Sequence, residues 1–177
     1  LNALTLQLSF VAAALATIYP FMKRYTHWPQ VVLGLAFGMG IPMSFAAEQN
    51  ALPPVAWVLY ITNLLWTVAY DTEYAMVDRK DDLKAGIKST AILFGEADRF
   101  IIGILQAMTL LGLGLTGLRA DLSWPYFVAL LIVAGLFAYQ QYLIHRRKPE
   151  KCFQAFLNNN WVGLTFFIGT LLGYWVQ

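Results

Sequence analysis

Charged residues are scarce in this chain. Asp, Glu, Lys and Arg make up 12% of its 177 residues, whereas about a quarter of an ordinary soluble domain is charged. Hydrophobic residues make up 59%, aromatic residues make up 15%, and the mean hydropathy is +0.57. These values exclude a soluble domain of this size and indicate an integral membrane protein.

Cysteine and the common catalytic motifs are also nearly absent. The single cysteine, Cys152, excludes an internal disulfide, and its position between Lys151 and Phe153 fits no metal-binding spacing, so we interpret it as structurally neutral. The sequence shows no nucleophile elbow, Ser/His/Asp arrangement, P-loop or zinc spacing, which disfavours hydrolytic and nucleotide-dependent mechanisms. No basic surface interleaved with aromatic residues appears, so no nucleic-acid partner is expected.

Long apolar runs, in contrast, are abundant. Six of them reach or approach the roughly 20 residues that a membrane crossing needs. None alternates with the two-residue period of a barrel strand, and backbone polar groups in lipid must be paired internally. The sequence therefore predicts an all-α, multi-pass transmembrane helical bundle with crossings at about Leu4–Met22, Val31–Ala47, Pro54–Glu73, Phe100–Leu118, Trp124–Ile144 and Phe156–Trp175.

The second run is rich in helix breakers. Gly34 and Gly38 form a G-x-x-x-G pair that allows a neighbouring helix to approach closely, and Pro42 predicts a kink. We expect the pair to serve packing; a broken helix that lines a cavity is the alternative.

Lys and Arg in the connections predict the orientation, because these residues are enriched in cytoplasmic loops. Six crossings place the first, third and fifth connections on one side, and these hold 11 of the 12 basic residues; only Arg119 falls opposite. The acidic stretch in the third connection is thus predicted to be cytoplasmic, with both chain ends on the other side. An outside first residue without an initiating Met suggests an odd number of upstream crossings, and hence a C-terminal fragment of a longer protein.

The acidic stretch runs from Tyr70 to Gly95, YDTEYAMVDRKDDLKAGIKSTAILFG. With the neighbouring Glu96 and Asp98 it holds seven of the ten carboxylates. If it is helical, Asp71, Asp78 and Asp82 lie within about 40° of one another on one face. Mg²⁺ prefers oxygen ligands and typically joins one or two carboxylates to phosphate oxygens, so the stripe suggests a metal-bridged phosphate site. An ordinary solvated loop of mixed charge is the alternative.

Two further polar segments accompany this stretch. The first connection brings Lys23, Arg24 and His27 to the same side of the membrane. There they form either an anion-binding surface that faces the metal site or only a signal that sets the orientation of the helices. The three asparagines 158–160 are predicted to open the last helix and to serve as caps or helix contacts rather than in substrate recognition.

At these residues the sequence closely resembles the UbiA family of intramembrane prenyltransferases, and within it the 4-hydroxybenzoate polyprenyltransferases of bacterial ubiquinone synthesis. The resemblance rests on YPFMKRYTHWPQVVLG at 19–34, YDTEYAMVDRKDDLKAGIKSTAILFG at 70–95 and FLNNNWVG at 156–163. It implies that residues 1–177 are the C-terminal part of one UbiA-type domain with nine helices, of which about six are present.

The resemblance also implies a chemistry for these residues. Two Asp-rich motifs of the family hold Mg²⁺ on the diphosphate of a polyprenyl donor, and Asp78 and Asp82 match the second, with Asp71 preceding them. Arg24 matches an arginine implicated in substrate binding. Lys80, Lys84 and Lys88 are weaker candidates for diphosphate contact and are equally interpretable as orientation signals.

The first Asp-rich motif, N-D-x-x-D-x-x-x-D, is absent from this sequence, so we expect the chain alone to be inactive. The activity implied for the complete enzyme is transfer of the polyprenyl group to the ring carbon ortho to the hydroxyl of 4-hydroxybenzoate, at the bacterial inner membrane. Three alternatives remain: another UbiA-type aromatic or lipid acceptor, a cation-coupled transporter, or a noncatalytic remnant that lacks the first Asp-rich motif.

Overall fold

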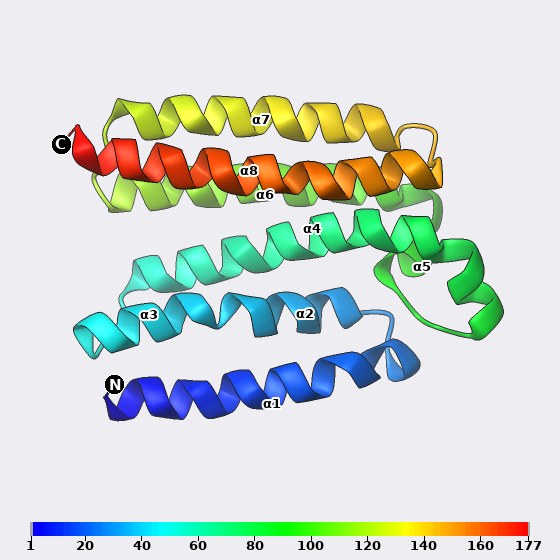
Figure 1. Ribbon diagram of the computed structural model, residues 1–177, viewed down its shortest axis with the longest axis horizontal. Helices are drawn as coiled ribbons and strands as arrows, with labels where there is room; N and C mark the ends of the chain where they lie inside the picture. The colour runs from blue at the N-terminus through cyan, green and yellow to red at the C-terminus, as the bar shows by residue number, and fades with distance from the viewer. Residues whose placement is uncertain (1, 177) are drawn as a thin grey trace.

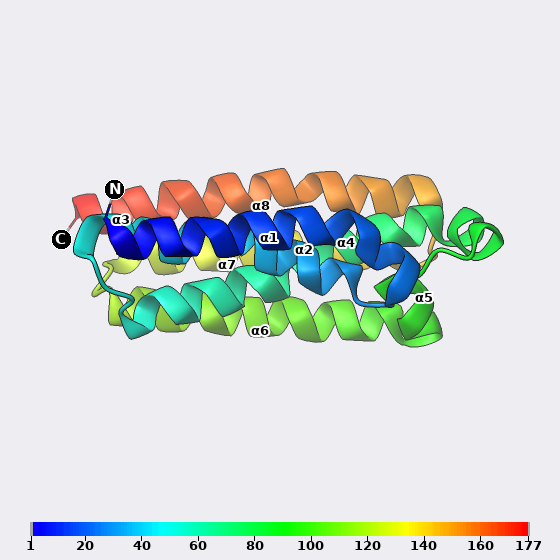
Figure 2. The same cartoon turned by 90° about the horizontal axis from the view of Figure 1, so that it is seen from below.

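The computed structural model describes residues 2–176, and within this range it consists of helices without strands (Figure 1). Consecutive long helices run antiparallel, so the two chain ends lie at one end of the bundle and α5 at the other (Figures 1 and 2). The elements are α1 (Ala3–Tyr25), α2 (Pro29–Gly38), α3 (Gly40–Gln49), α4 (Pro54–Ala85), α5 (Thr90–Phe94), the 3-10 turn η1 (Gly95–Ala97), α6 (Asp98–Arg119), α7 (Trp124–Ile144) and α8 (Pro149–Trp175).

The all-α prediction is confirmed, and each predicted run corresponds to a helix or a helix pair. In the described part of the chain, four segments are long and apolar enough to cross a membrane: α1, α2 with α3, α5 to α6, and α7. The helices α4 and α8 lie alongside them but carry the acidic stretch and the asparagines. The predicted crossings Pro54–Glu73 and Phe156–Trp175 lie within these two helices, which are longer because each continues beyond its apolar section into polar sequence.

The helix α4 is central, since it packs against α2, α3, α6 and α8. Its 32 residues span about 48 Å, whereas the hydrocarbon layer is about 30 Å thick. The last turns of α4 accordingly project past the ends of α1 and α8 (Figures 1 and 2). It ends at Gly86, whose φ of +67° suits a residue without a side chain and whose N–H caps the carbonyls of Asp82 and Leu83.

The second predicted run is broken into α2 and α3 at Met39. Pro42 explains the position, because it cannot donate to the carbonyl four residues earlier, at Gly38, and its ring crowds that carbonyl. The packing role of the glycine pair is confirmed: an added Cβ at Gly34 would lie 2.6 Å from a methyl carbon of Leu64 on α4. At Gly38 it would lie 2.8 Å from the ring of Tyr60, also on α4.

The buried core is concentrated among α4, α6, α7 and α8. One cluster, near the charged end, joins small and branched side chains and includes the buried free Cys152, in agreement with a structural role. In contrast, α1 packs on α2 and α3 and buries only Thr5 among its described residues.

Candidate functional site

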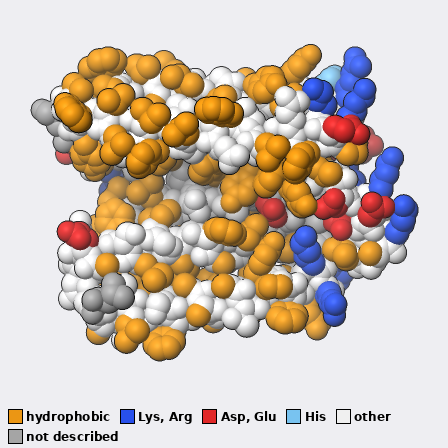
Figure 3. All heavy atoms as spheres, in the orientation of Figure 1, with side chains coloured by type: hydrophobic (Ala, Val, Ile, Leu, Met, Phe, Trp, Pro, Cys, Tyr) orange, Lys and Arg blue, Asp and Glu red, His pale blue; other side chains and the backbone are white. Residues whose placement is uncertain are grey.

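In the bundle, α4 lies between α8 on one side and α1 and α2 on the other (Figure 1), and the surface is hollowed into a groove along this part of the molecule. Figure 3 shows this hollow, with carboxylates gathered toward its charged end. Part of it is a pocket of about 400 Å³, lined by Phe37, Asn63, Trp66, Tyr70, Phe156, Leu157, Asn159 and Asn160. The ring of Tyr70 contacts both Trp66 and Phe156, at centroid distances of 5.9 and 6.1 Å. The pocket therefore has an aromatic wall close to the carboxylates.

The predicted aspartate stripe lies on one continuous helix, because α4 extends to Ala85. Of the three aspartates, Asp71 is nearest the membrane interior. The Lys23 ammonium attracts its carboxylate electrostatically, and the Gln30 side chain is its hydrogen-bond partner. Asp82 lies farther out, where Lys23 also acts on it. The first connection thus contributes Lys23 to the acidic face of α4.

Too little positive charge lies near the Asp82 carboxylate to offset the effect of its burial on its pKa. Burial raises the pKa of Asp82, the Lys23 ammonium opposes this rise, and the carboxylates of Asp78 and Asp81 add to it. A cation bound at this face would favour the ionised form of Asp82.

The aspartates of α4 offer a partial set of ligands for a divalent ion. Among the described residues, no group of three or more His, Cys, Asp or Glu side chains converges closely enough to hold a metal by itself. Mg²⁺, however, usually takes one or two protein carboxylates and completes its shell with water and phosphate oxygens. The pair Asp78 and Asp82, one helical turn apart, fits that partial donor set.

The basic candidates differ in their surroundings. Arg24 is exposed at the end of α1, and Lys80 is exposed on α4. Lys84 forms an exposed ion pair with Asp81, at 3.0 Å. Lys88 donates from its ammonium to the carbonyl of Tyr25 and from its backbone N–H to the carbonyl of Lys23. Lys88 therefore ties the end of α1 to the loop after α4.

The segment 86–91, GIKSTA, places α5 against the aspartate helix. The Ser89 hydroxyl accepts from the N–H of Ile92 and caps α5. The hydroxyls of Thr72 and Thr90 are 2.7 Å apart, and the N–H of Thr90 donates to the buried Gln30 side chain on α2. Gln30 thus joins α5 to the surroundings of Asp71, a role that sequence reasoning missed because a lone Gln carries no pattern.

A second feature that sequence reasoning missed is a buried polar network around Glu73. One carboxylate oxygen of Glu73 accepts from Asn159 on α8 at 3.1 Å, and the other faces the amide of Gln106 on α6 at 3.5 Å. The Asn159 oxygen accepts from the indole N–H of Trp66, and Gln106 donates to Gln140 on α7. Four helices are thereby joined through polar groups in the bundle interior.

This network corrects one prediction and supports another. Because α8 begins at Pro149, the asparagines 158–160 lie in mid-helix and do not cap its start. The alternative of helix contact is confirmed, since Asn158 accepts from Gln140 and Asn159 donates to Glu73.

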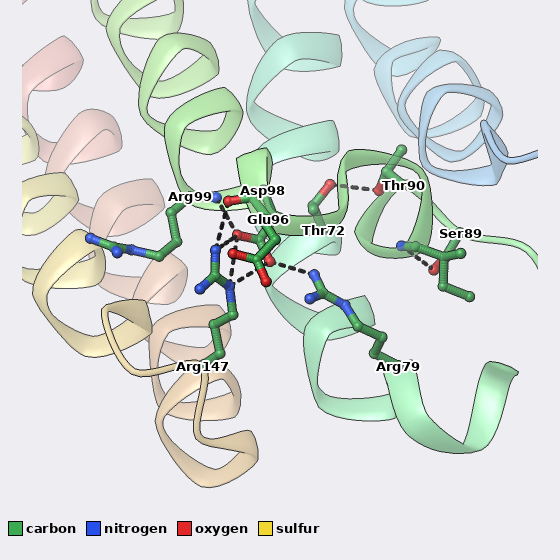
Figure 4. Close-up of polar contacts among 9 residues, drawn as sticks. Thr72, Arg79, Ser89, Thr90, Glu96, Asp98, Arg99 and Arg147 are labelled. Atoms are coloured by element: carbon green, nitrogen blue, oxygen red, sulfur yellow. Dashed lines mark hydrogen bonds and ion pairs between the residues drawn. The ribbon is translucent and has the colours of Figure 1, made fainter.

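A third cluster, at the charged end, holds α4, α6 and the α7–α8 connection together (Figure 4). Its centre is the fully buried carboxylate of Asp98, which pairs with Arg79 and with Arg147, the latter at 3.0 Å. Arg147 also donates to the carbonyl of Glu96. The hydrogen bond to Asp98 raises the pKa of Arg147, so the pair remains ionised. This cluster fixes the part of α4 that carries Asp78 and Asp82.

Together, the bundle, its aromatic-walled groove and the aspartate helix define a membrane-embedded protein whose groove suits an apolar ligand with an anionic end. The family model for the UbiA prenyltransferase family matches residues 1–175. This chain belongs to the UbiA prenyltransferase family.

Curated relatives and solved structures agree with this assignment. A 4-hydroxybenzoate octaprenyltransferase of Escherichia fergusonii is 57% identical over 175 residues, which are 99% of this chain and 60% of the relative. The enzyme of the same name from Saccharophagus degradans is 60% identical over 171 residues, 97% of this chain and 57% of the relative. This chain therefore spans about three fifths of the length of these relatives.

The fold recurs in two solved structures of low sequence identity. The apo structure of a UbiA homolog from Aeropyrum pernix K1 superposes with a TM-score of 0.82 at 22% identity, over 97% of this chain and 65% of that one. A digeranylgeranylglyceryl phosphate synthase superposes with a TM-score of 0.81 at 17% identity, over 97% of this chain and 62% of that one. These likenesses establish the fold.

Proposed function

We propose that this chain supplies the second half of the active site of a 4-hydroxybenzoate polyprenyltransferase. The reaction moves a polyprenyl group from polyprenyl diphosphate to the ring carbon ortho to the hydroxyl of 4-hydroxybenzoate, releases diphosphate and a proton, and serves ubiquinone synthesis. The observation that carries the proposal is that Asp78 and Asp82 lie on the projecting turns of α4, where the Lys23 ammonium acts electrostatically on Asp82, while the same helix supplies Trp66 and Tyr70 to the aromatic-walled pocket. The names of the curated relatives support the choice of acceptor.

Three groups of residues would have different chemical roles in this reaction. Asp78 and Asp82 would hold Mg²⁺, which stabilises charge on the departing diphosphate when it is bound. Asp71, two helical turns earlier on the same face of α4, is a further proposed ligand but lies too far along the helix to share one ion with this pair. Lys23 and Arg24 add positive charge at the same end of the bundle, where the anionic end of either substrate would lie. The apolar and aromatic surface of the groove would cover the isoprenoid tail and exclude water.

Aromatic rings have a further use in this reaction. The allylic carbon becomes positively charged as the bond to diphosphate breaks, and the faces of Trp66, Tyr70 and Phe156 attract positive charge. Their position near the carboxylates favours bond breaking at the boundary between the polar and apolar parts of the groove.

The test is prenyl transfer to 4-hydroxybenzoate by the full-length protein in membranes, with Mg²⁺ and with EDTA. We expect Asp78→Asn and Asp82→Asn each to remove most turnover, because each loses a carboxylate that the metal needs. Asp81→Asn is the matched control: the same change on an exposed neighbour whose partner is Lys84. Near-normal turnover in both Asp78→Asn and Asp82→Asn would refute the metal assignment.

Two comparisons separate the alternatives. Activity of this chain alone would show that residues 1–177 suffice, against our expectation. Transfer to a lipid or a different aromatic acceptor, but not to 4-hydroxybenzoate, would keep the family chemistry and change the substrate. Cation-driven uptake without prenyl transfer would favour the transporter alternative.

Arg24 can be tested by a conservative change. Arg24→Lys keeps the charge but loses the planar fork that binds a carboxylate or phosphate through two hydrogen bonds. We expect a raised KM for one of the two substrates, and that substrate identifies the anion Arg24 binds. Wild-type kinetics would restrict Arg24 to a role in topology.

A further inference from the structure

A second concave surface lies between α6 and α7, lined by residues other than those of the groove described above. It is a pocket of about 530 Å³, lined by Glu96, Arg99, Phe100, Gly103, Ile104, Ala107, Gln141 and Arg147. The proposed reaction uses none of these side chains. Its polar residues lie at the charged end of the bundle, and the remaining positions on α6 continue toward the membrane interior.

Arg99 is the basic side chain in this pocket that the fold does not use. Arg79 and Arg147 hold the Asp98 carboxylate, whereas Figure 4 shows the Arg99 side chain directed away from it. The Nε atoms of Arg79 and Arg99 are both buried without a hydrogen-bond partner within residues 2–176, but Arg79 pairs with Asp98 through another nitrogen, whereas Arg99 forms no ion pair in this range. A guanidinium without an ion-pair partner in the wall of a pocket favours a ligand with anionic oxygens.

The rest of the pocket suits a hydrocarbon chain. Gly103 and Ala107 follow Arg99 at intervals of four residues and so lie beneath it on one face of α6. Phe100 and Ile104, exposed by 71% and 43%, flank this strip of small residues. One wall of the pocket therefore changes from charged to apolar along the direction in which a lipid molecule spans its leaflet.

The charges around the pocket favour an anion. Arg79, Arg99 and Arg147 outnumber Glu96 and Asp98 by one unit. Beyond Arg147, a neighbouring hollow is lined by His145, Arg146, Lys148 and Lys151 without a carboxylate. Figure 3 shows Lys and Arg side chains gathered at the charged end of the bundle.

We propose that the α6–α7 pocket binds an anionic phospholipid from the surrounding leaflet. Its phosphate accepts hydrogen bonds from Arg99, and one acyl chain lies along Gly103 and Ala107. Basic pockets between membrane helices are suited to anionic lipid headgroups in this way. The proposal is independent of the prenyl-transfer reaction.

The experiment measures lipid binding to the delipidated protein in detergent by native mass spectrometry. The probes are phosphatidylglycerol, phosphatidylcholine with the same acyl chains, and inorganic phosphate. We expect preferential retention of phosphatidylglycerol, and Arg99→Gln should weaken it about fivefold, the effect of one basic residue near an anionic headgroup. Arg119→Gln is the matched control, because it removes the same charge from the opposite end of α6.

Two further variants separate binding from folding. Glu96→Gln removes the carboxylate from the pocket and should strengthen phosphatidylglycerol binding, a change that a damaged fold would not produce. Gly103→Leu keeps every charge and fills the apolar strip; its Cβ fits, since the nearest atom, on Gln141, is 3.7 Å away. It should weaken binding of both lipids.

Several results would overturn the proposal. One is equal retention of phosphatidylcholine and phosphatidylglycerol by the unchanged protein. A second is unchanged phosphatidylglycerol binding in Arg99→Gln or in Gly103→Leu. A third is Arg99-dependent stabilisation by inorganic phosphate equal to that by the lipid, which would identify a site for free anions.

Discussion

The substitution Asp98→Asn tests how the charged end of the bundle is held together. It keeps the size of the side chain but removes its negative charge. Asp98 is completely buried, accepts from Arg79 and Arg147, and also accepts from the backbone N–H of Arg99 at 2.6 Å. The amide would present an N–H₂ group to guanidinium donors that need an acceptor.

The expected cost follows from the burial of the three side chains. Breaking a buried ion pair by removing one partner typically costs 3–5 kcal/mol, because the other charge is left uncompensated. Arg79 and Arg147 are exposed by 23% and 33%, so water partly solvates them once they are released. We therefore expect the lower end, about 3 kcal/mol in the free energy of unfolding, or roughly a hundredfold in the unfolding equilibrium constant.

The assay is equilibrium unfolding in mixed micelles with increasing SDS, followed by tryptophan fluorescence. Asp81→Asn is the control: it is the same substitution at the same end of the bundle, in a pair whose side chains are exposed by 85% and 79%. Exposed pairs of this kind contribute at most about 1 kcal/mol. Equal losses in the two variants, or a loss below about 1 kcal/mol for Asp98→Asn, would refute the reasoning.

Three other predictions follow from the structure. In the same assay, Glu73→Gln should lower the free energy of unfolding by under about 1 kcal/mol and Glu73→Leu by about 2–3 kcal/mol, because the Asn159 amide needs a hydrogen-bond acceptor rather than a charge. Equal losses in the two variants would contradict this explanation. Gly117→Ala should destabilise by about 1–2 kcal/mol, since its Cβ would lie 2.3 Å from a tyrosine ring of α7. Gly114→Ala on the same helix, where no atom lies within 4 Å, should stabilise slightly. Because the pKa of Asp82 is raised above the ordinary 3.8, transfer activity should decline on acidification at a pH above that value. More Mg²⁺ should move the decline to lower pH, and a decline independent of Mg²⁺ would exclude Asp82 as its source.

Hydropathy located the helices because each apolar run must be long enough to cross lipid. The range Trp124–Ile144 was predicted without error, since its apolar sequence begins and ends with the helix. The same signal located only the apolar sections of α4 and α8, whose helices continue into polar sequence. Backbone hydrogen bonding and packing on neighbouring helices maintain a helix regardless of hydropathy, so its true ends are set by caps such as Gly86.

The aspartate stripe could be predicted because helical spacing is a property of one segment. Its partners could not, because they depend on which helices meet. Gln30 reaches Asp71 from α2, and Asn159 reaches Glu73 from α8, across 41 and 86 positions of sequence. Both residues lie in segments that carry the family resemblance, but neither residue type indicates its partner, and only the packing of α2 and α8 on α4 brings them into range.

The sequence DRKDD carries the proposed metal ligands and a structural ion-pair residue on different faces of one helix. Asp78 and Asp82 share a face, whereas Arg79 is rotated by about 100° from Asp78 and pairs with Asp98. On the other side, the backbone of Lys88 bonds to Lys23 at the end of α1. The projecting turns of α4 are therefore anchored from both sides without using the proposed metal ligands. This arrangement explains why the charge run is dense: the basic residue between the aspartates orients them through α6, and the aspartates remain available to a cation and its diphosphate.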